Sequence, residues 1–208
     1  MRMTSRSPAK APTTRAEPER PALAANVLDA VADLPRHAAV LCIATAAVFM
    51  AMLGLEFLCF ERLSGGILTL DLWVFGFTPD EGMAWLTALG RRSSEIIIVW
   101  HYLTFDLLFP ALLSATFVSL ILWTGRRLPR FAALKARMQA AFALGLVLPY
   151  TLADYVQNLV LVRLLSDFLN ANPDSLAFAS ALTVTSFALA VVPMAVIVTF
   201  YLAGRRRA

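Results

Sequence analysis

The sequence predicts an all-α polytopic membrane protein, a four-transmembrane-helix bundle with a short extra helix in its outer loop. The chain is 59% hydrophobic and has a mean hydropathy of +0.70, above the usual range of soluble domains. Lys and Arg residues gather between the apolar runs rather than within them. A helix needs about 20 residues to cross a ~30 Å hydrocarbon core. Four apolar runs reach that length: residues 38–60, 96–123, 140–162 and 176–202.

The positions of the basic residues predict the orientation of these four helices. Fourteen of the 18 Lys and Arg residues lie before the first run, between the second and third runs, or at the C-terminus. Cytoplasmic segments of membrane proteins carry such an excess. We therefore expect both termini in the cytoplasm, residues 61–95 on the outer side, and a location in a bacterial inner (plasma) membrane.

The same charge pattern bears on partners. The net charge of +4 follows the membrane topology, so no nucleic-acid partner is expected. Membrane lipid is the expected surrounding, and a homo-oligomer or a complex with other membrane proteins stays open.

Residues 1–22, rich in Pro, Thr, Ser, Ala and charge, predict a disordered cytoplasmic tail, and residues 23–208 a single membrane domain. Residues 23–34 alternate apolar and acidic positions at helical spacing, which predicts a short helix at the inner surface.

The outer loop contains a strong helix start. Thr78 can cap the helix, Pro79 suits its first position, and Glu81 can complete a capping box. Gly90 is a natural stop, so a helix over residues 79–89 is expected to cover the outer end of the bundle or to lie on the membrane surface.

Polar residues inside the apolar runs indicate where function resides. A charged side chain at a helix centre costs at least ~2.5–3.5 kcal/mol, so each requires a reason. The candidate catalytic groups are Asp106, Asp154, Glu56 and His101. The candidate polar residues of a cavity are Tyr102, Tyr150, Gln157, Asn158 and Ser186.

Depth and direction along the helices refine this prediction. Asp106 and Asp154 lie roughly 16 and 13 Å from the outer helix ends, whereas Glu56, His101 and Asn158 lie about 8–9 Å deep. We expect an outward-opening cavity with the two aspartates near its floor, within hydrogen-bond or one-water distance. At 100° per residue His101 points about 140° away from Asp106, which predicts that these two do not pair.

The chain resembles a family of uncharacterised four-helix membrane proteins that is widespread in bacteria. The family pattern on the third helix usually reads D-Y-x-E-N, and Gln157 departs from it by removing a carboxylate and a potential metal ligand. The resemblance implies the architecture and the site but no activity. It rests on the segments LDL (70–72), GFTPDE (76–81), LGR (89–91), DLLFP (106–110) and DYVQN (154–158).

Three functions remain open from the sequence. The first is a structural or assembly component of the membrane whose polar residues satisfy one another around a cavity open to the outer side. The second is a membrane enzyme acting on a lipid or isoprenoid-like substrate through its intramembrane carboxylates, and the third is a proton or cation transport component. H-x-x-x-H, P-loop, Rossmann and G-x-S-x-G signatures are absent, so the sequence names no cofactor, no metal and no reaction.

Overall fold

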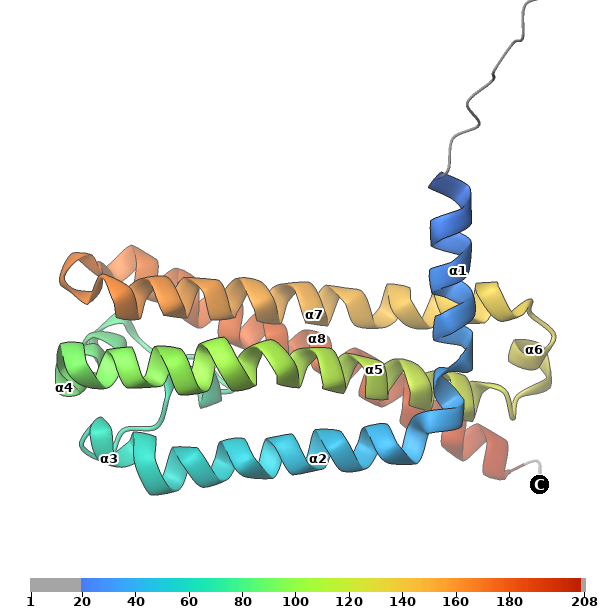
Figure 1. Cartoon of the computed structure of the whole chain (residues 1–208), viewed down its shortest axis with the longest axis horizontal. Helices are drawn as coiled ribbons and strands as arrows, with labels where there is room; N and C mark the ends of the chain where they lie inside the picture. The colour runs from blue at the N-terminus through green and yellow to red at the C-terminus, as the bar shows by residue number, and fades with distance from the viewer. Residues whose placement is uncertain (1–19, 207–208) are drawn as a thin grey trace, which may run out of the picture.

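The computed structural model describes residues 20–206 and confirms the all-α prediction: it is 88% helical, and the described part of the chain has no strand. Four helical segments long and apolar enough to cross a membrane run along the molecule (Figure 1). They are α2 (Ala38–Leu55) with η2 (Glu56–Phe60), α4 (Pro79–Ile97) with η4 (Ile98–Phe105) and α5 (Asp106–Gly125), α7 (Ala136–Ser166), and α8 (Pro173–Arg205).

Shorter helices lie at the two ends of the bundle. The first, α1 (Arg20–Asp33), runs across the bundle axis (Figure 1), as expected for a helix at a membrane surface. Arg137 at the start of α7 holds it through a bidentate ion pair with Asp29, both bonds 2.7 Å long. The others are η1 (Leu34–His37), α3 (Glu61–Leu63), η3 (Leu70–Leu72), α6 (Pro129–Ala132) and η5 (Phe168–Asn170).

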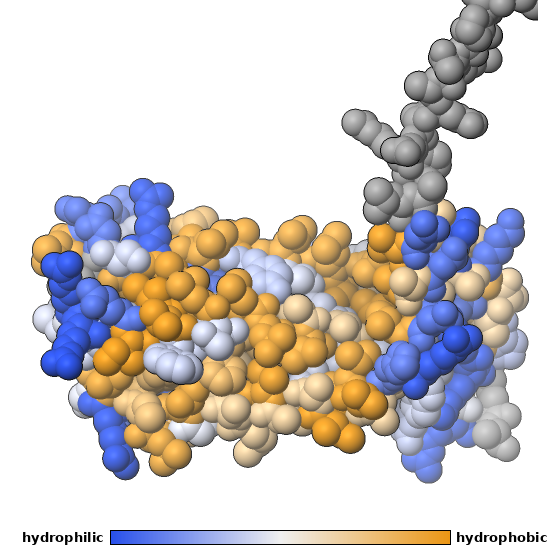
Figure 2. Space-filling view, in the orientation of Figure 1, coloured by the Kyte–Doolittle hydropathy of each residue, from blue (hydrophilic) through white to orange (hydrophobic). Residues whose placement is uncertain are grey.

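The predicted tail over residues 1–22 lies outside the described residues except for its last three, which begin α1. The face shown in Figure 2 carries a broad apolar band across its middle and hydrophilic residues at both ends. Large apolar side chains of the spanning helices are exposed, among them Val40 and Ile43 of α2 and Leu159 of α7. An apolar surface of this extent is stable in lipid and not in water, so the chain is a multi-pass membrane protein.

The predicted capping box is present at the start of α4. Thr78 Oγ1 accepts a hydrogen bond from Glu81 N–H at 3.3 Å, and the Glu81 carboxylate accepts one from Thr78 N–H at 2.7 Å. Gly90 interrupts the helical path with a φ of +62°, a conformation that glycine adopts without a Cβ penalty. The chain turns there and enters the membrane span, so the predicted helix 79–89 is the first part of α4.

This first part of α4 covers one end of the bundle. Trp85 and Leu86 are fully buried in a core cluster with Leu161 of α7 and Leu176 of α8. A second apolar cluster, centred on Ile121 of α5 and its neighbours in α7 and α8, fills the opposite end. Several polar side chains of the spans are buried within this bundle, among them Glu56, His101 and Asp106.

Candidate functional site

A local change of helix type brings His101 and Asp106 together. Residues Ile98–Phe105 form a π-helix, in which the Asp106 N–H donates to the His101 carbonyl five residues earlier. Five residues make about one turn of a π-helix, so His101 and Asp106 share a face. His101 Nε2 lies 3.5 Å from Asp106 Oδ2. The prediction that they do not pair was wrong because it assumed α-helical spacing throughout.

A third member of this cluster comes from the loop before α4. Asp71, in η3, places its Oδ2 2.9 Å from His101 Nε2, and the Tyr102 hydroxyl donates to its Oδ1 at 3.2 Å. Burial alone raises the pKa of Asp71, but the charge and hydrogen bond of His101 outweigh it, so this pKa lies below the ordinary 3.8. Sequence reasoning missed Asp71 as a site residue. The available signal was a lone carboxylate in the apolar segment 67–77.

Glu56 and Tyr102 support this loop. Neither side chain lines the cavity within the spans, where Tyr102 was predicted to lie. Glu56 is 1% exposed, and its two carboxylate oxygens accept hydrogen bonds from the Thr69 N–H at 2.8 Å and the Thr69 hydroxyl at 2.9 Å. Tyr102 is fully buried behind Asp71. Glu56 accepts the hydrogen bonds of Thr69, and Tyr102 donates one to Asp71. These bonds satisfy the buried polar groups of the loop and hold it over the two side chains.

A cavity of about 510 Å³ lies beside the cluster and is lined by residues of α2, η3, α5, α7 and α8. Its wall combines a larger apolar part with a smaller polar part. The apolar lining includes Phe49, Phe109, Leu113, Phe117, Phe187 and Met194; the polar lining consists of Asp71, Asp106, Tyr150, Asp154, Gln157, Asn158 and Ser186.

The two predicted aspartates thus line one cavity, and their approach to hydrogen-bond distance stays a prediction. Other polar residues of the wall are satisfied internally: Ser186 Oγ donates to Gln157 Oε1 at 2.6 Å, and Asn158 Nδ2 donates to the Tyr102 carbonyl at 3.1 Å. Asp154 has no hydrogen-bond partner among the described residues, and it faces the open space. It is therefore the carboxylate best placed to meet a bound molecule.

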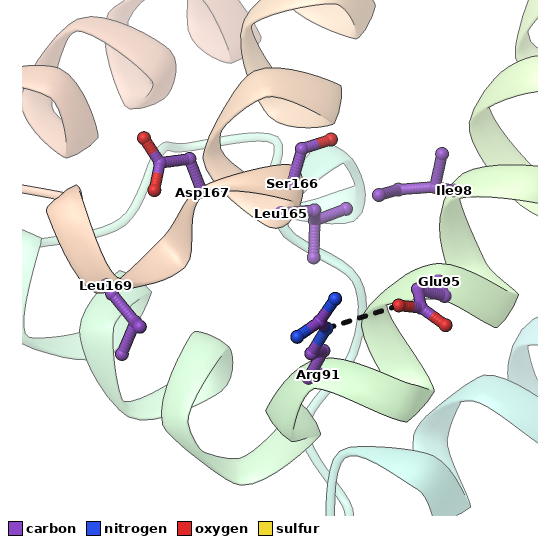
Figure 3. Close-up of a pocket in the computed structure, with 7 residues that line it drawn as sticks. All are labelled: Arg91, Glu95, Ile98, Leu165, Ser166, Asp167 and Leu169. Carbon is purple, nitrogen blue, oxygen red and sulfur yellow. Dashed lines mark hydrogen bonds and ion pairs between the residues drawn. The ribbon is translucent and has the colours of Figure 1, made fainter.

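A second cavity, of about 440 Å³, lies at the end of the bundle that carries the loop (Figure 3). The Arg91–Glu95 ion pair on its rim, 3.4 Å long, is largely exposed to solvent. Exposed pairs of this kind contribute little, and the cavity contains no cluster of buried titratable groups. The mixed cavity within the spans is the better candidate. The residues that line the second cavity are Arg91, Glu95, Ile98, Leu165, Ser166, Asp167 and Leu169.

Comparisons of the chain with protein-family models, with curated proteins and with solved structures found no match.

Proposed function

We propose that this protein binds an amphipathic molecule, a lipid or a lipid-like compound, in the cavity between its spanning helices. The apolar part of the ligand would lie against Phe49, Phe117 and Met194, and its polar end would reach Asp106 and Asp154. The observation that carries the proposal is the cavity itself, about 510 Å³ in volume, mostly apolar, and bounded on one side by carboxylates. Binding sites for small molecules share this combination of apolar wall and few polar groups.

The lining of the cavity supports an occupant. The cavity is partly open and mostly apolar, so its wall favours contact with an apolar molecule over contact with water. Water needs two to four polar partners per molecule, which the aromatic part of the wall does not offer. An acyl or isoprenoid-like chain would cover this apolar part of the wall.

The polar end of the ligand would be one that donates hydrogen bonds. Carboxylates accept hydrogen bonds and repel anions, so a hydroxyl or an amine fits this part of the wall. If the molecule is a substrate, Asp154 is the group that could exchange protons with it.

A structural or assembly role is the second candidate. The hydrogen bonds of Glu56 to Thr69 and of Gln157 to Ser186 favour it, because they show polar side chains that already satisfy one another. The same bonds do not account for Asp154 or for the apolar space beside it.

The proposal includes a bacterial inner membrane with both termini in the cytoplasm. The middle-loop Arg and Lys residues and the Arg205 end of α8 gather at the bundle end that holds α1 and α6 (Figure 1), which supports this orientation. Reporter fusions after residue 208 and within residues 126–135 should behave as cytoplasmic, and one within residues 64–78 should behave as periplasmic. A periplasmic signal from either of the first two would reject this orientation.

Native mass spectrometry of the purified protein tests ligand binding. We expect a lipid-sized adduct on the wild type and its loss, by about tenfold or more, in Ala190→Phe, which fills the cavity. Ala188→Phe is the matched control, because Ala188 lies exposed on the same helix, outside the cavity. Equal adducts on both variants would reject the cavity as the binding site and favour the assembly role.

A further inference from the structure

We propose that Asp71, His101 and Asp106 form a binding site for a divalent transition-metal ion, with Zn²⁺ as the ion that the donor set fits best. Each residue offers one ligand atom, and these atoms all lie within 4.8 Å of one another. One imidazole nitrogen and two carboxylate oxygens are donors that zinc accepts in sites with three protein ligands. The proposal stands on this cluster and holds whatever molecule occupies the cavity.

The spacing of the donors suits a metal. Zn–N and Zn–O bonds of about 2.0–2.1 Å place neighbouring ligand atoms roughly 3.3–3.4 Å apart in a tetrahedron. His101 Nε2 lies 2.9 Å from Asp71 Oδ2 and 3.5 Å from Asp106 Oδ2. These two edges bracket the tetrahedral value, and the remaining edge between the two carboxylates is no longer than 4.8 Å.

The excess of carboxylates in the cluster favours the binding of a cation. Two carboxylates face a single imidazole, and Asp154 lies on the same cavity wall. No Lys or Arg of residues 20–206 forms an ion pair with Asp71 or Asp106. An excess of buried negative charge is costly in low dielectric, and a divalent ion would neutralise it.

The cluster does not close through its own hydrogen bonds. His101 is 2% exposed, and its Nε2 is the ring nitrogen that faces both carboxylates. The contact of 3.5 Å to Asp106 is longer than the 2.7–2.9 Å typical of a charge-assisted hydrogen bond. A divalent ion between His101 Nε2 and the two carboxylates would replace this long contact with metal–ligand bonds.

The surroundings suit a functional metal. The Tyr102 hydroxyl orients Asp71 from behind, as groups around metal ligands commonly do. Asp71 and Asp106 both line the cavity, so a bound ion would keep a coordination position open toward it. An open position distinguishes catalytic from structural zinc sites.

Metal analysis of the full-length, tag-free protein tests the proposal. After chelator treatment and dialysis against Zn²⁺, we expect one zinc per chain by mass spectrometry, and visible absorption bands of tetrahedral Co²⁺ after dialysis against that ion. Asp71→Asn and His101→Gln should each weaken zinc binding by at least about 10- to 100-fold. Glu95→Gln is the control, because Glu95 is an exposed carboxylate outside the cluster and the cavity, so this variant should keep the zinc.

Gel filtration and circular dichroism establish that each variant is folded; if Asp71→Asn is not, Asp106→Asn replaces it. Equal zinc content in the wild type and His101→Gln would overturn the proposal, as would a wild type that binds no zinc. Because lipid adducts are measured separately, a failed lipid experiment leaves this result interpretable.

Discussion

Replacing Glu56 should loosen the loop that delivers Asp71 to the cluster. In Glu56→Gln one carboxylate oxygen becomes an NH₂ group, which leaves one of the two Thr69 donors without an acceptor. An unsatisfied buried donor costs about 1–3 kcal/mol, and Glu56→Ala, which orphans both donors, should cost about twice as much. At about 2–4 °C per kcal/mol for a chain of this size, the unfolding midpoint of Glu56→Gln should fall by roughly 2–12 °C.

Thermal unfolding in detergent, followed by circular dichroism, measures this effect, and proteolysis within residues 64–78 reports on the loop directly. Glu95→Gln is the matched control, because Glu95 is two-thirds exposed in its ion pair with Arg91. We expect no measurable change in its midpoint. If Glu56→Gln and Glu95→Gln behave alike, the Glu56–Thr69 bonds do not hold the loop, and the reasoning fails.

Two further predictions concern packing. Gly76→Ala should destabilise the protein more than Gly66→Ala: both glycines have positive φ, but a Cβ on Gly76 would lie 2.7 Å from Ser180 Oγ, whereas one on Gly66 would meet nothing within 4 Å. Equal losses in thermal midpoint would show that this contact relaxes freely. The hydrogen bond of 2.8 Å between Thr45 and Thr116 joins α2 to α5; a double-mutant cycle with valine at both positions should give a coupling of about 0.6 kcal/mol, and additive losses would contradict it.

The spans and the outer helix could be predicted because their signals are local. Residues 38–60 form one continuous helical segment as expected, and the Thr78–Glu81 capping box forms between neighbouring residues. The placement of polar residues along α7 was also accessible, because that helix is regular. Tyr150, Gln157 and Asn158 line one cavity there.

The cluster itself could not be predicted in this way. Helical spacing of 100° per residue fails within Ile98–Phe105, since a π-helix depends on the packing around it rather than on a residue pattern. Asp71 arrives from a loop whose path is set by its contacts with Glu56 and His101. The π-helix and the path of the loop both depend on contacts between residues far apart in the sequence, and both contribute residues to the same cluster.

The order of residues in this cluster has a consequence for biogenesis. Glu56, Thr69, Asp71, His101 and Asp106 all belong to one helical hairpin, formed by the first two spans and their connecting loop. Charged groups enter a bilayer more readily when their partners enter with them. The hairpin can therefore pair its own ionisable residues during insertion, before α7 and α8 have been synthesised.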